Sequence, residues 1–477
     1  MNTTKNLYAF TLGREWKVSL AELFALWGTD AYQSHTETVA IFQIIGYSVE
    51  QLQRKFLTIG GSIRIIQILG DTTPASFPTD VIEFMMAQKG TGKIDFALGS
   101  YGVEFRLSDI GLRIKKTMQD TGSSIRLANV KNENINAASF KKEKLAKTGY
   151  EYNIIAIPSD VKIRSRDSQE QEIRGRENFS KWGYNWVSDR EKSLSDKEAR
   201  SSSGSLHCFI GRTLACQDID SYAKRDTAKS RDMITGMMPP KLVQMMINIA
   251  TAWENLANKS NPISIYDPFC GLGTTLIEAA NMGITRVYGS DLSPEMTRST
   301  ESSLAEYIAE ERMWQERILK VGGTPNKDFS GFQSKVLQLD ARDISMAKSK
   351  LEIPGIPFSK IVIVSEWYLG EIMHASQITL DKAKEERRKL GRMYDEFFAG
   401  LALAKFCNSI VMTFPFWNLN GTYSYFIEIY DIIDKHGFEA VSLLPWEMKL
   451  NTMKGSLLYR RENQTVGREI IRVVPKK

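Results

Sequence analysis

The sequence is poor in the residues that hold metals and disulfides, with only four cysteines and four histidines among 477 residues. The cysteines, at positions 208, 216, 270 and 407, form no Cys-x-x-Cys pair, the spacing typical of zinc sites. No apolar run approaches the roughly 20 residues that cross a bilayer, and the N-terminus lacks the apolar stretch of a secretory signal. We therefore expect no bound metal, no membrane span and a cytoplasmic location.

Chain length and net charge exclude fewer classes of function than the shortage of cysteine, histidine and long apolar runs does. A chain of this length is long enough for two or three domains. Its net charge of +6 is compatible with a polyanionic partner, but it is also common in proteins that bind no nucleic acid. No repeat of 20 to 50 residues is present.

The first 160 residues predict alternating strands and helices. A capping box from Ser19 to Glu22 is typical of a helix start, and that helix is expected to stop at Gly28. The other expected strands are 7–12, 38–45, 63–69, 94–98, 125–127 and 152–157, and the other helices are 49–57, 110–118 and 138–147. We expect an α+β fold, with a ferredoxin-like subdomain over residues 1–90 and a second region over residues 91–160.

Two further features concern charge. Basic residues gather on the expected helices and their borders in the second region, where they form either a phosphate-binding face or an ordinary solvated surface: Arg113, Lys115, Lys116, Arg126, Lys141, Lys142, Lys144 and Lys147. Residues 161–210 are rich in charges of both signs, and we expect a linker or insertion there. Its aromatic residues, Phe179, Trp182, Tyr184 and Trp186, are expected to dock on a domain.

The most informative segment is an apolar strand, residues 263–267, that runs into a turn with Gly271 and Gly273 and then into a helix. Two glycines two residues apart let the backbone pass close under a ligand, and the helix N-terminus faces that ligand. No lysine follows Gly273, as a phosphate-cradling P-loop requires. Leu276 stands where a dinucleotide-binding turn has its third glycine. Both absences disfavour a nucleotide triphosphate and a nicotinamide cofactor.

Carboxylates at three successive strand ends favour S-adenosylmethionine instead. Asp267 can accept from an amino-acid ammonium group, Asp291 from both hydroxyls of a ribose, and Asp340 from an adenine amino group. We expect a Rossmann-like α/β domain over residues 211–477. Its expected cofactor-binding residues are Asp267, Phe269, Gly271, Gly273, Thr274, Asp291, Leu292, Asp340 and Ala341.

These residues resemble those of the THUMP-domain RNA methyltransferases, and among them the tRNA guanosine-N2 methyltransferases. The resemblance rests on the cofactor loop 267–274 with residues 276–279, on the upstream stretches 217–226 and 236–242, and on 459–470 near the C-terminus. It implies S-adenosylmethionine as methyl donor and tRNA as substrate, with or without a small activating partner protein. It also implies a THUMP-like RNA-binding region over residues 91–160.

The sequence departs from the family where the methyl group is transferred. Amino-methylating enzymes usually carry Asp or Asn, two prolines and an aromatic residue after the fourth strand, whereas here Glu366, Trp367 and Tyr368 follow the strand 361–364. We expect Glu366 and the backbone carbonyl of Trp367 to accept the two amine hydrogens. Tyr368 is expected to stack on an extruded base.

Three functions remain open from the sequence. The first is methylation of guanosine N2 in tRNA, for which the family suggests a position such as 10. The second is methylation of another amine in RNA or DNA, such as adenine N6, because the changed motif can meet a different base edge. The third is a tRNA-binding protein in which the methyltransferase fold is a catalytically impaired scaffold, with Trp367 and Tyr368 packed as a plug.

Overall fold

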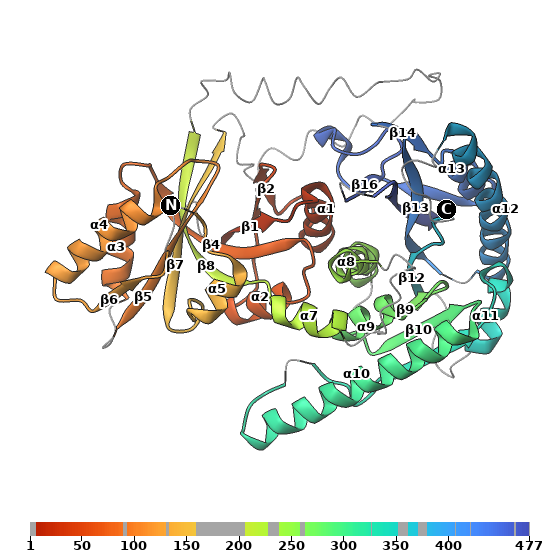
Figure 1. Ribbon diagram of the computed structural model, residues 1–477, viewed down its shortest axis with the longest axis horizontal. Helices are drawn as coiled ribbons and strands as arrows, with labels where there is room; N and C mark the ends of the chain where they lie inside the picture. Colours follow the sequence, from red (N-terminus) through yellow and green to blue (C-terminus); the bar gives the residue numbers. More distant parts are fainter. Residues whose placement is uncertain are drawn as a thin grey trace. The chain divides into compact units, whose positions relative to one another are not determined.

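The computed structural model describes residues 6–88, 93–129, 133–158, 206–227, 238–257, 263–325, 327–351, 361–370, 379–405, 407–419, 421–461 and 464–476 (Figure 1). Residues 159–205, which hold most of the expected insertion and its aromatic residues, lie outside this set, as do residues 236 and 237. Within the described ranges, no helix has both the length and the apolar character needed to cross a membrane. The same ranges contain no group of three or more potential metal ligands.

Two compact units make up the chain. The N-terminal unit takes in residues 1–16, 27–56 and 62–219. The C-terminal unit takes in residues 220–477 together with two short segments from early in the chain, 17–26 and 57–61.

The first half of the N-terminal unit has a ferredoxin-like order of elements. Its strands and helices are β1 (Leu7–Leu12), α1 (Trp16–Trp27), β2 (Tyr32–His35), β3 (Val39–Gln43), α2 (Val49–Phe56) and β4 (Ser62–Thr72). The strands lie in the order β2-β3-β1-β4, and every neighbouring pair is antiparallel. This βαββαβ arrangement confirms the ferredoxin-like part of the expected fold.

The second half continues the same sheet. It contains α3 (Phe77–Ala87), β5 (Ile94–Tyr101), α4 (Leu107–Asp120), β6 (Ile125–Leu127), α5 (Ala137–Lys142), β7 (Gly149–Pro158) and β8 (Leu206–Cys216). Strand β5 pairs in parallel with β6 and β7, and β8 joins β7 to β4 by antiparallel pairing on both sides. Buried side chains of α3 and α4 form one hydrophobic core with β5, β7 and β8.

Two expectations for this region are wrong. Ser19 and Glu22 do not cap a helix, because α1 begins three residues earlier at Trp16 and both side chains are buried. Glu22 instead accepts hydrogen bonds from the backbone N–H groups of Gly60 and Gly61 and from Asn248. The expected boundary between residues 210 and 211 also falls inside β8, whose pairing with β4 and β7 makes the whole strand part of the N-terminal sheet.

The C-terminal unit is built on a second, mostly parallel sheet in the order β11-β10-β9-β12-β13-β17-β15. Its strands are β9 (Ser264–Asp267), β10 (Arg286–Asp291), β11 (Gln333–Gln338), β12 (Ile361–Glu366), β13 (Ser409–Leu419), β14 (Thr422–Tyr425), β15 (Phe438–Val441), β16 (Leu457–Tyr459) and β17 (Val466–Pro475). Strands β9 to β13 are parallel, and β17 pairs antiparallel with β13 and β15. This is the Rossmann-like order expected from the sequence, with its switch point between β9 and β12.

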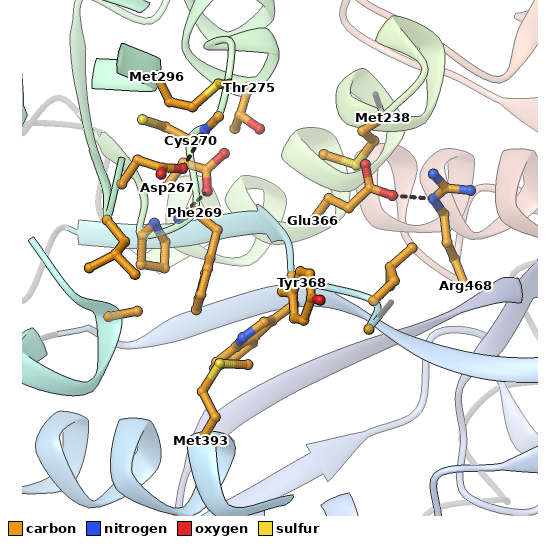
Figure 2. Close-up of a pocket in the computed structure, with 18 of the residues that line it drawn as sticks. Met238, Asp267, Phe269, Cys270, Thr275, Met296, Glu366, Tyr368, Met393 and Arg468 are labelled. Carbon is orange, nitrogen blue, oxygen red and sulfur yellow. Dashed lines mark hydrogen bonds and ion pairs between the residues drawn. The ribbon is translucent and has the colours of Figure 1, made fainter. Parts of the chain in front are cut away.

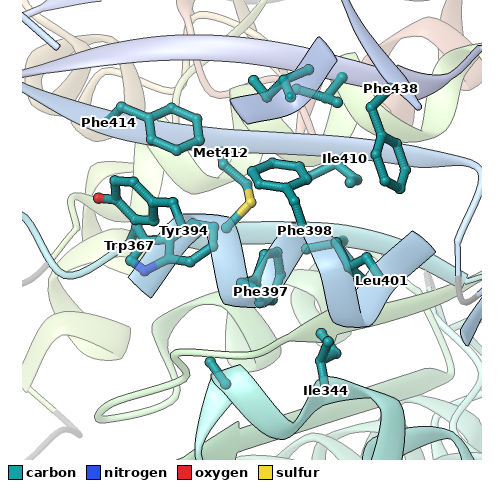
Figure 3. Packing of buried hydrophobic residues seen from close by; sticks show 14 of the residues in the cluster. Ile344, Trp367, Tyr394, Phe397, Phe398, Leu401, Ile410, Met412, Phe414 and Phe438 are labelled. Atoms are coloured by element: carbon teal, nitrogen blue, oxygen red, sulfur yellow. The ribbon is translucent and has the colours of Figure 1, made fainter. Parts of the chain in front are cut away.

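Helices cover both faces of this sheet. They are α7 (Ile219–Thr227), α8 (Pro240–Ala257), α9 (Thr274–Asn281), α10 (Pro294–Lys320), α11 (Ile344–Leu351), α12 (Leu380–Ala404) and α13 (Glu428–Lys435), with short 3-10 turns η3 (Ala341–Asp343) and η5 (Trp446–Met448). On one face, α11, α12 and α13 bury an aromatic core against the strands, in which Phe397, Phe398 and Phe414 surround Met412 (Figure 3). This packing fixes the strand ends from which the site is built.

Candidate methyltransferase site

A cavity of about 1360 Å³ opens at the carboxyl ends of β9, β10 and β12 (Figure 2). All the residues that line it belong to the C-terminal unit. In open α/β sheets, ligands bind outside the strand ends where the strand order reverses, and β9 and β12 meet at that point here. Ligand sites commonly measure about 300–1,000 Å³, so this cavity has room for a nucleoside cofactor and a substrate base together.

The glycine turn after β9 lines the cavity through Gly271, whereas Gly273 is not among the lining residues. Gly271 and Gly273 have φ angles of +48° and +78°, which side chains rarely adopt. A Cβ atom on Gly273 would lie 2.8 Å from Thr300 Cγ2, so this glycine also allows a close approach to α10. The Thr300 hydroxyl donates to the carbonyl oxygen of Gly271 at 2.6 Å and fixes the turn from below.

Asp267 ends β9 and is almost completely buried. Its Oδ1 accepts from the Ser365 hydroxyl at 2.6 Å and from the backbone N–H of Phe269 at 3.0 Å. Burial raises the pKa of Asp267 to about 6, although hydrogen bonds from Ser365, Thr275 and Phe269 favour the charged form. A buried carboxylate of this kind gains from a cationic ligand group.

Asp291 and Asp340 stand at the ends of the next two strands. The two oxygens of Asp291 accept backbone N–H groups from Gly271, at 3.0 Å, and from Ser293, at 2.9 Å, so the carboxylate is fixed against the glycine turn. Both oxygens of Asp340 accept from Arg342, which lowers the pKa of Asp340. The sequence pattern did not indicate that arginine.

The remaining expected cofactor residues also line the cavity, but they differ in exposure. Phe269 packs its ring against Trp367, whereas the side chain of Leu292 is 65% exposed at the rim. Thr274 begins α9 directly after the glycine turn, and Ala341 begins η3.

The arrangement fits S-adenosylmethionine. Asp267, Asp291 and Asp340 come together on one wall, with acceptors for an ammonium group, a ribose and an adenine in that order along the strands. The position that a Cβ of Gly271 would occupy has no atom within 4 Å, which leaves room for a ligand directly above the turn. Residues 267–275 would therefore hold the amino-acid part, and Asp291 with Leu292 the ribose.

Trp367 belongs to the residues that line the cavity, but its indole ring is anchored in the core. Its indole ring is 1% exposed and lies 4.3 Å, centroid to centroid, from both Tyr394 and Phe397 of α12. It also contacts Phe269 of the cofactor loop at 4.5 Å. The buried ring therefore ties the loop after β12 to the loop after β9, and only the backbone of Trp367 remains to meet a substrate.

Tyr368 behaves differently from its neighbour. Its side chain is 53% exposed at the cavity, beside the strand end that carries Glu366 (Figure 2). Its backbone carbonyl accepts from the Tyr394 hydroxyl at 3.3 Å. The loop is thus fixed while the Tyr368 ring stays accessible, as stacking on a base requires.

Glu366, the last residue of β12, forms an ion pair with Arg468 of β17 (Figure 2). Both side chains are nearly buried, at 13% and 4% exposure. Burial raises the pKa of Glu366, and the charge and hydrogen bond of Arg468 oppose that shift. The arginine also donates from Nη1 to Gln464 Oε1 at 3.2 Å.

Sequence reasoning missed the functional part played by Ser365, Arg468 and Gln464. Arg468 and Gln464 lie about 100 positions beyond Glu366. Arg468 reaches Glu366 only because β13 pairs with both β12 and β17, and Gln464 contacts Arg468. The sequence holds one signal that could have found them, since both belong to the 459–470 stretch that carries the family resemblance.

Residues 243–322 match the family model of the RMKL-like methyltransferase domain, UPF0020. Two curated tRNA (guanine(10)-N2)-dimethyltransferases are similar over 99 residues, one from Methanothermobacter thermautotrophicus at 40% identity and one from Methanocaldococcus jannaschii at 33%. Each match covers 21% of this chain, and the chain spans about a quarter of their length, 27% and 26%.

A solved structure, TrmN from Thermus thermophilus, aligns with 98% of this chain and 99% of its own at 13% identity and a TM-score of 0.42. The methyltransferase match includes most of α8, the glycine turn, β10 and α10, and Asp267, Asp291 and Met296 of this stretch line the cavity. The similarity of residues 243–322 to a methyltransferase domain agrees with S-adenosylmethionine as the cofactor that the cavity fits.

Proposed function

We propose that this protein transfers a methyl group from S-adenosylmethionine to N2 of a guanosine in tRNA. The observation that carries the proposal is a single cavity that joins the three cofactor carboxylates to Glu366 and Tyr368. The 99-residue similarity to tRNA (guanine(10)-N2)-dimethyltransferases supports guanosine N2 as the target.

The chemistry assigned to the site needs positioning more than a strong base. When bound, S-adenosylmethionine supplies an electrophilic methyl group on its sulfonium sulfur. Glu366 and the backbone carbonyl of Trp367 accept the two amine hydrogens, so that the nitrogen lone pair points at the methyl carbon. The proton that the amine loses passes first to the acceptor beside it, Glu366.

The exposed ring of Tyr368 is assigned to the target base. A base inside an RNA helix is inaccessible to an active site of this depth, and extrusion exposes its faces. Stacking of an aromatic side chain on a base contributes about 1–3 kcal/mol. The ring of Tyr368 stands beside the amine acceptor, where an extruded guanine would lie.

The N-terminal unit is assigned to tRNA binding, with residues 91–160 as its THUMP-like part and the cytoplasm as its location. Support comes from exposed basic residues of α4 and of the stretch before β7, including Arg113, Lys116 and Lys144. Two members of the expected basic face are neutralised, because Arg126 pairs with Asp95 and Glu143 and Lys141 pairs with Asp218. The phosphate-binding face is therefore smaller than the sequence indicated. A small activating partner protein stays part of the proposal.

Incubation of the purified protein with methyl-labelled S-adenosylmethionine and unmodified tRNA transcripts tests the reaction. After digestion, mass analysis of the nucleosides should place the label in N2-methylguanosine or its dimethyl form. Label in another nucleoside, or none despite measured cofactor and tRNA binding, would contradict the proposal.

The substitution Glu366→Ala tests the assignment of the acceptor. We expect methyl transfer to fall by at least about 100-fold, the usual contribution of a positioned proton acceptor, while calorimetric affinity for the cofactor stays unchanged. Glu439→Ala is the matched control, because Glu439 is an exposed glutamate of β15 outside the cavity. Wild-type turnover by the Glu366 variant would remove Glu366 from the chemistry.

A further inference from the structure

Glu366 presents one carboxylate oxygen to the cavity and uses the other to bind Arg468. Oε1 accepts from Arg468 Nε. No donor among the residues that the structure describes contacts Oε2, and Glu366 lines the cavity next to Trp367 and Tyr368. The side chain therefore offers a substrate a fixed hydrogen-bond acceptor.

Arg468 determines the orientation of that acceptor. The arginine is almost fully buried, and Gln464 holds its Nη1 while Nε holds Glu366. Strand β13 lies between the two partners and fixes their register, with Thr413 opposite Glu366 and Pro415 opposite Arg468. The carboxylate cannot rotate freely, and its charge is balanced without using the oxygen that faces the cavity.

A carboxylate differs from the asparagine that some of the amino-methylating motifs carry, because it accepts hydrogen bonds and donates none. Among the four RNA bases, only guanine has a ring N–H, at N1, directly beside its amino group. In adenine and cytosine the ring nitrogen beside the amine is an acceptor, and its lone pair would face the carboxylate oxygen. An unpaired, repelled acceptor in a buried site is costly.

From this geometry we propose that Glu366, held in place by Arg468, selects guanine by accepting hydrogen bonds from N1–H and from one hydrogen of N2. The carbonyl of Trp367 takes the other N2 hydrogen. Glu366 is thus a specificity-determining residue as well as the amine acceptor. This inference rests on the proposed methylation of guanosine N2, and it deepens that proposal by naming the atom that is recognised.

A base analogue tests the inference without altering the protein. The guanosine that the wild-type protein methylates is replaced by 2-aminopurine in a synthetic RNA, which keeps the amino group but has an acceptor at N1. We expect kcat/KM for the analogue to fall by about 10- to 100-fold, the fold-change that corresponds to one hydrogen bond to a charged group.

The substitution Glu366→Gln should reverse the preference. Its amide places an N–H donor where 2-aminopurine has an acceptor, so the ratio of guanosine to 2-aminopurine turnover should fall to about one or below. Arg468→Lys should weaken the discrimination, because lysine offers a single point of contact in place of the planar fork. Arg472→Lys, four residues along β17 and outside the cavity, is the control for general damage to the strand.

The outcomes separate the two proposals. If guanosine is methylated but 2-aminopurine is methylated equally well, recognition of N1–H is wrong and the proposed function stands. If Glu366→Gln binds cofactor normally and keeps the wild-type preference, Glu366 does not select the base. If the wild-type protein methylates adenosine or cytidine in place of guanosine, both proposals fall.

Discussion

Asp267 is a buried carboxyl group whose position suits it to a cationic ligand group. Its pKa is raised to about 6 because burial outweighs three hydrogen bonds that favour the ionised form. Without cofactor, the folded protein holds the Asp267 proton more tightly than the unfolded chain does. The contribution of Asp267 to folding is therefore most favourable below the ordinary pKa of an aspartate, near 4. Stability is lost as the pH rises through 6.

Cofactor binding should have the opposite pH dependence. The ammonium group of S-adenosylmethionine interacts with the ionised form of Asp267, so affinity should fall by up to about tenfold for each pH unit below 6. Isothermal titration calorimetry between pH 5 and 8 measures this directly. Asp267→Asn, which cannot titrate, should bind weakly at every pH in that range. If the wild-type affinity does not change with pH, Asp267 does not contact the ammonium group.

The positions of individual site residues were predictable from the sequence where the local sequence pattern alone determines them. Asp267 and Asp291 are the last residues of β9 and β10, Asp340 lies two residues beyond β11, and the carboxyl ends of parallel strands meet at one edge. Arg468 and the buried role of Trp367 were not predictable, because each depends on which distant segments pair or pack. The predicted capping role of Glu22 was wrong for the same reason, since its hydrogen-bond partners are Gly60 and Asn248.

Helix α12 supports the loop after β12 in place of the proline pair that related motifs carry there. Prolines stiffen a loop through the backbone, whereas here Tyr394 and Phe397 of α12 hold the Trp367 ring from the core side (Figure 3). The Tyr394 hydroxyl also fixes the carbonyl of Tyr368. Rigidity in this loop therefore comes from packing against a helix.

Removal of this ring should damage both stability and catalysis. Trp367→Ala should lower the free energy of unfolding by about 3–5 kcal/mol, the usual cost of deleting a buried aromatic side chain. Trp367→Phe should cost much less, because the indole Nε1 has no hydrogen-bond partner among the described residues. Urea unfolding followed by circular dichroism measures both. Tyr368→Ala, at an exposed ring, is the control, and equal losses for the two alanine variants would refute the anchoring role.

Six strands of the N-terminal sheet were expected from periodicity, and β1 and β6 have the expected bounds. In the C-terminal sheet, β9 to β12 were expected, whereas β13, β14 and β15 were not. Strand β8 was not expected, because its sequence follows a long charged stretch and its pairing partners, β4 and β7, are far away in the chain. Strand β2 and helix α3 were also missed. Local propensity is a weak guide where pairing with distant strands decides the outcome.

Each compact unit is organised around its own sheet. In the N-terminal sheet, β8 pairs with β4 and β7 and so joins the two halves. Pro158 and Leu206 are opposite each other in the pairing of β7 with β8. The chain therefore leaves the sheet at one point and returns to it at the neighbouring position. Pro158 and Leu206 are held about one strand spacing apart, roughly 5 Å.

Replacement of residues 159–205 by an Asn-Gly turn should leave the sheet intact. We propose that residues 159–205 are the linker or insertion expected from the sequence. Each halving of such a linker lowers its closure cost by about 0.6 kcal/mol, so the shortened unit should be more stable by about 2–3 kcal/mol. Thermal unfolding compares it with the full chain, and the methylation assay shows whether RNA modification needs the deleted residues. A loss of stability would show that the segment packs on the sheet.

The pairing of Pro158 with Leu206 also makes this position suitable for the insertion of a foreign domain. The sheet requires only that the segment joining β7 to β8 has two ends that lie close together. Any independently folding module whose own termini are adjacent, such as a fluorescent reporter or an affinity handle, meets that requirement. The same geometry lets related chains gain or lose sequence here while the core residues keep their neighbours.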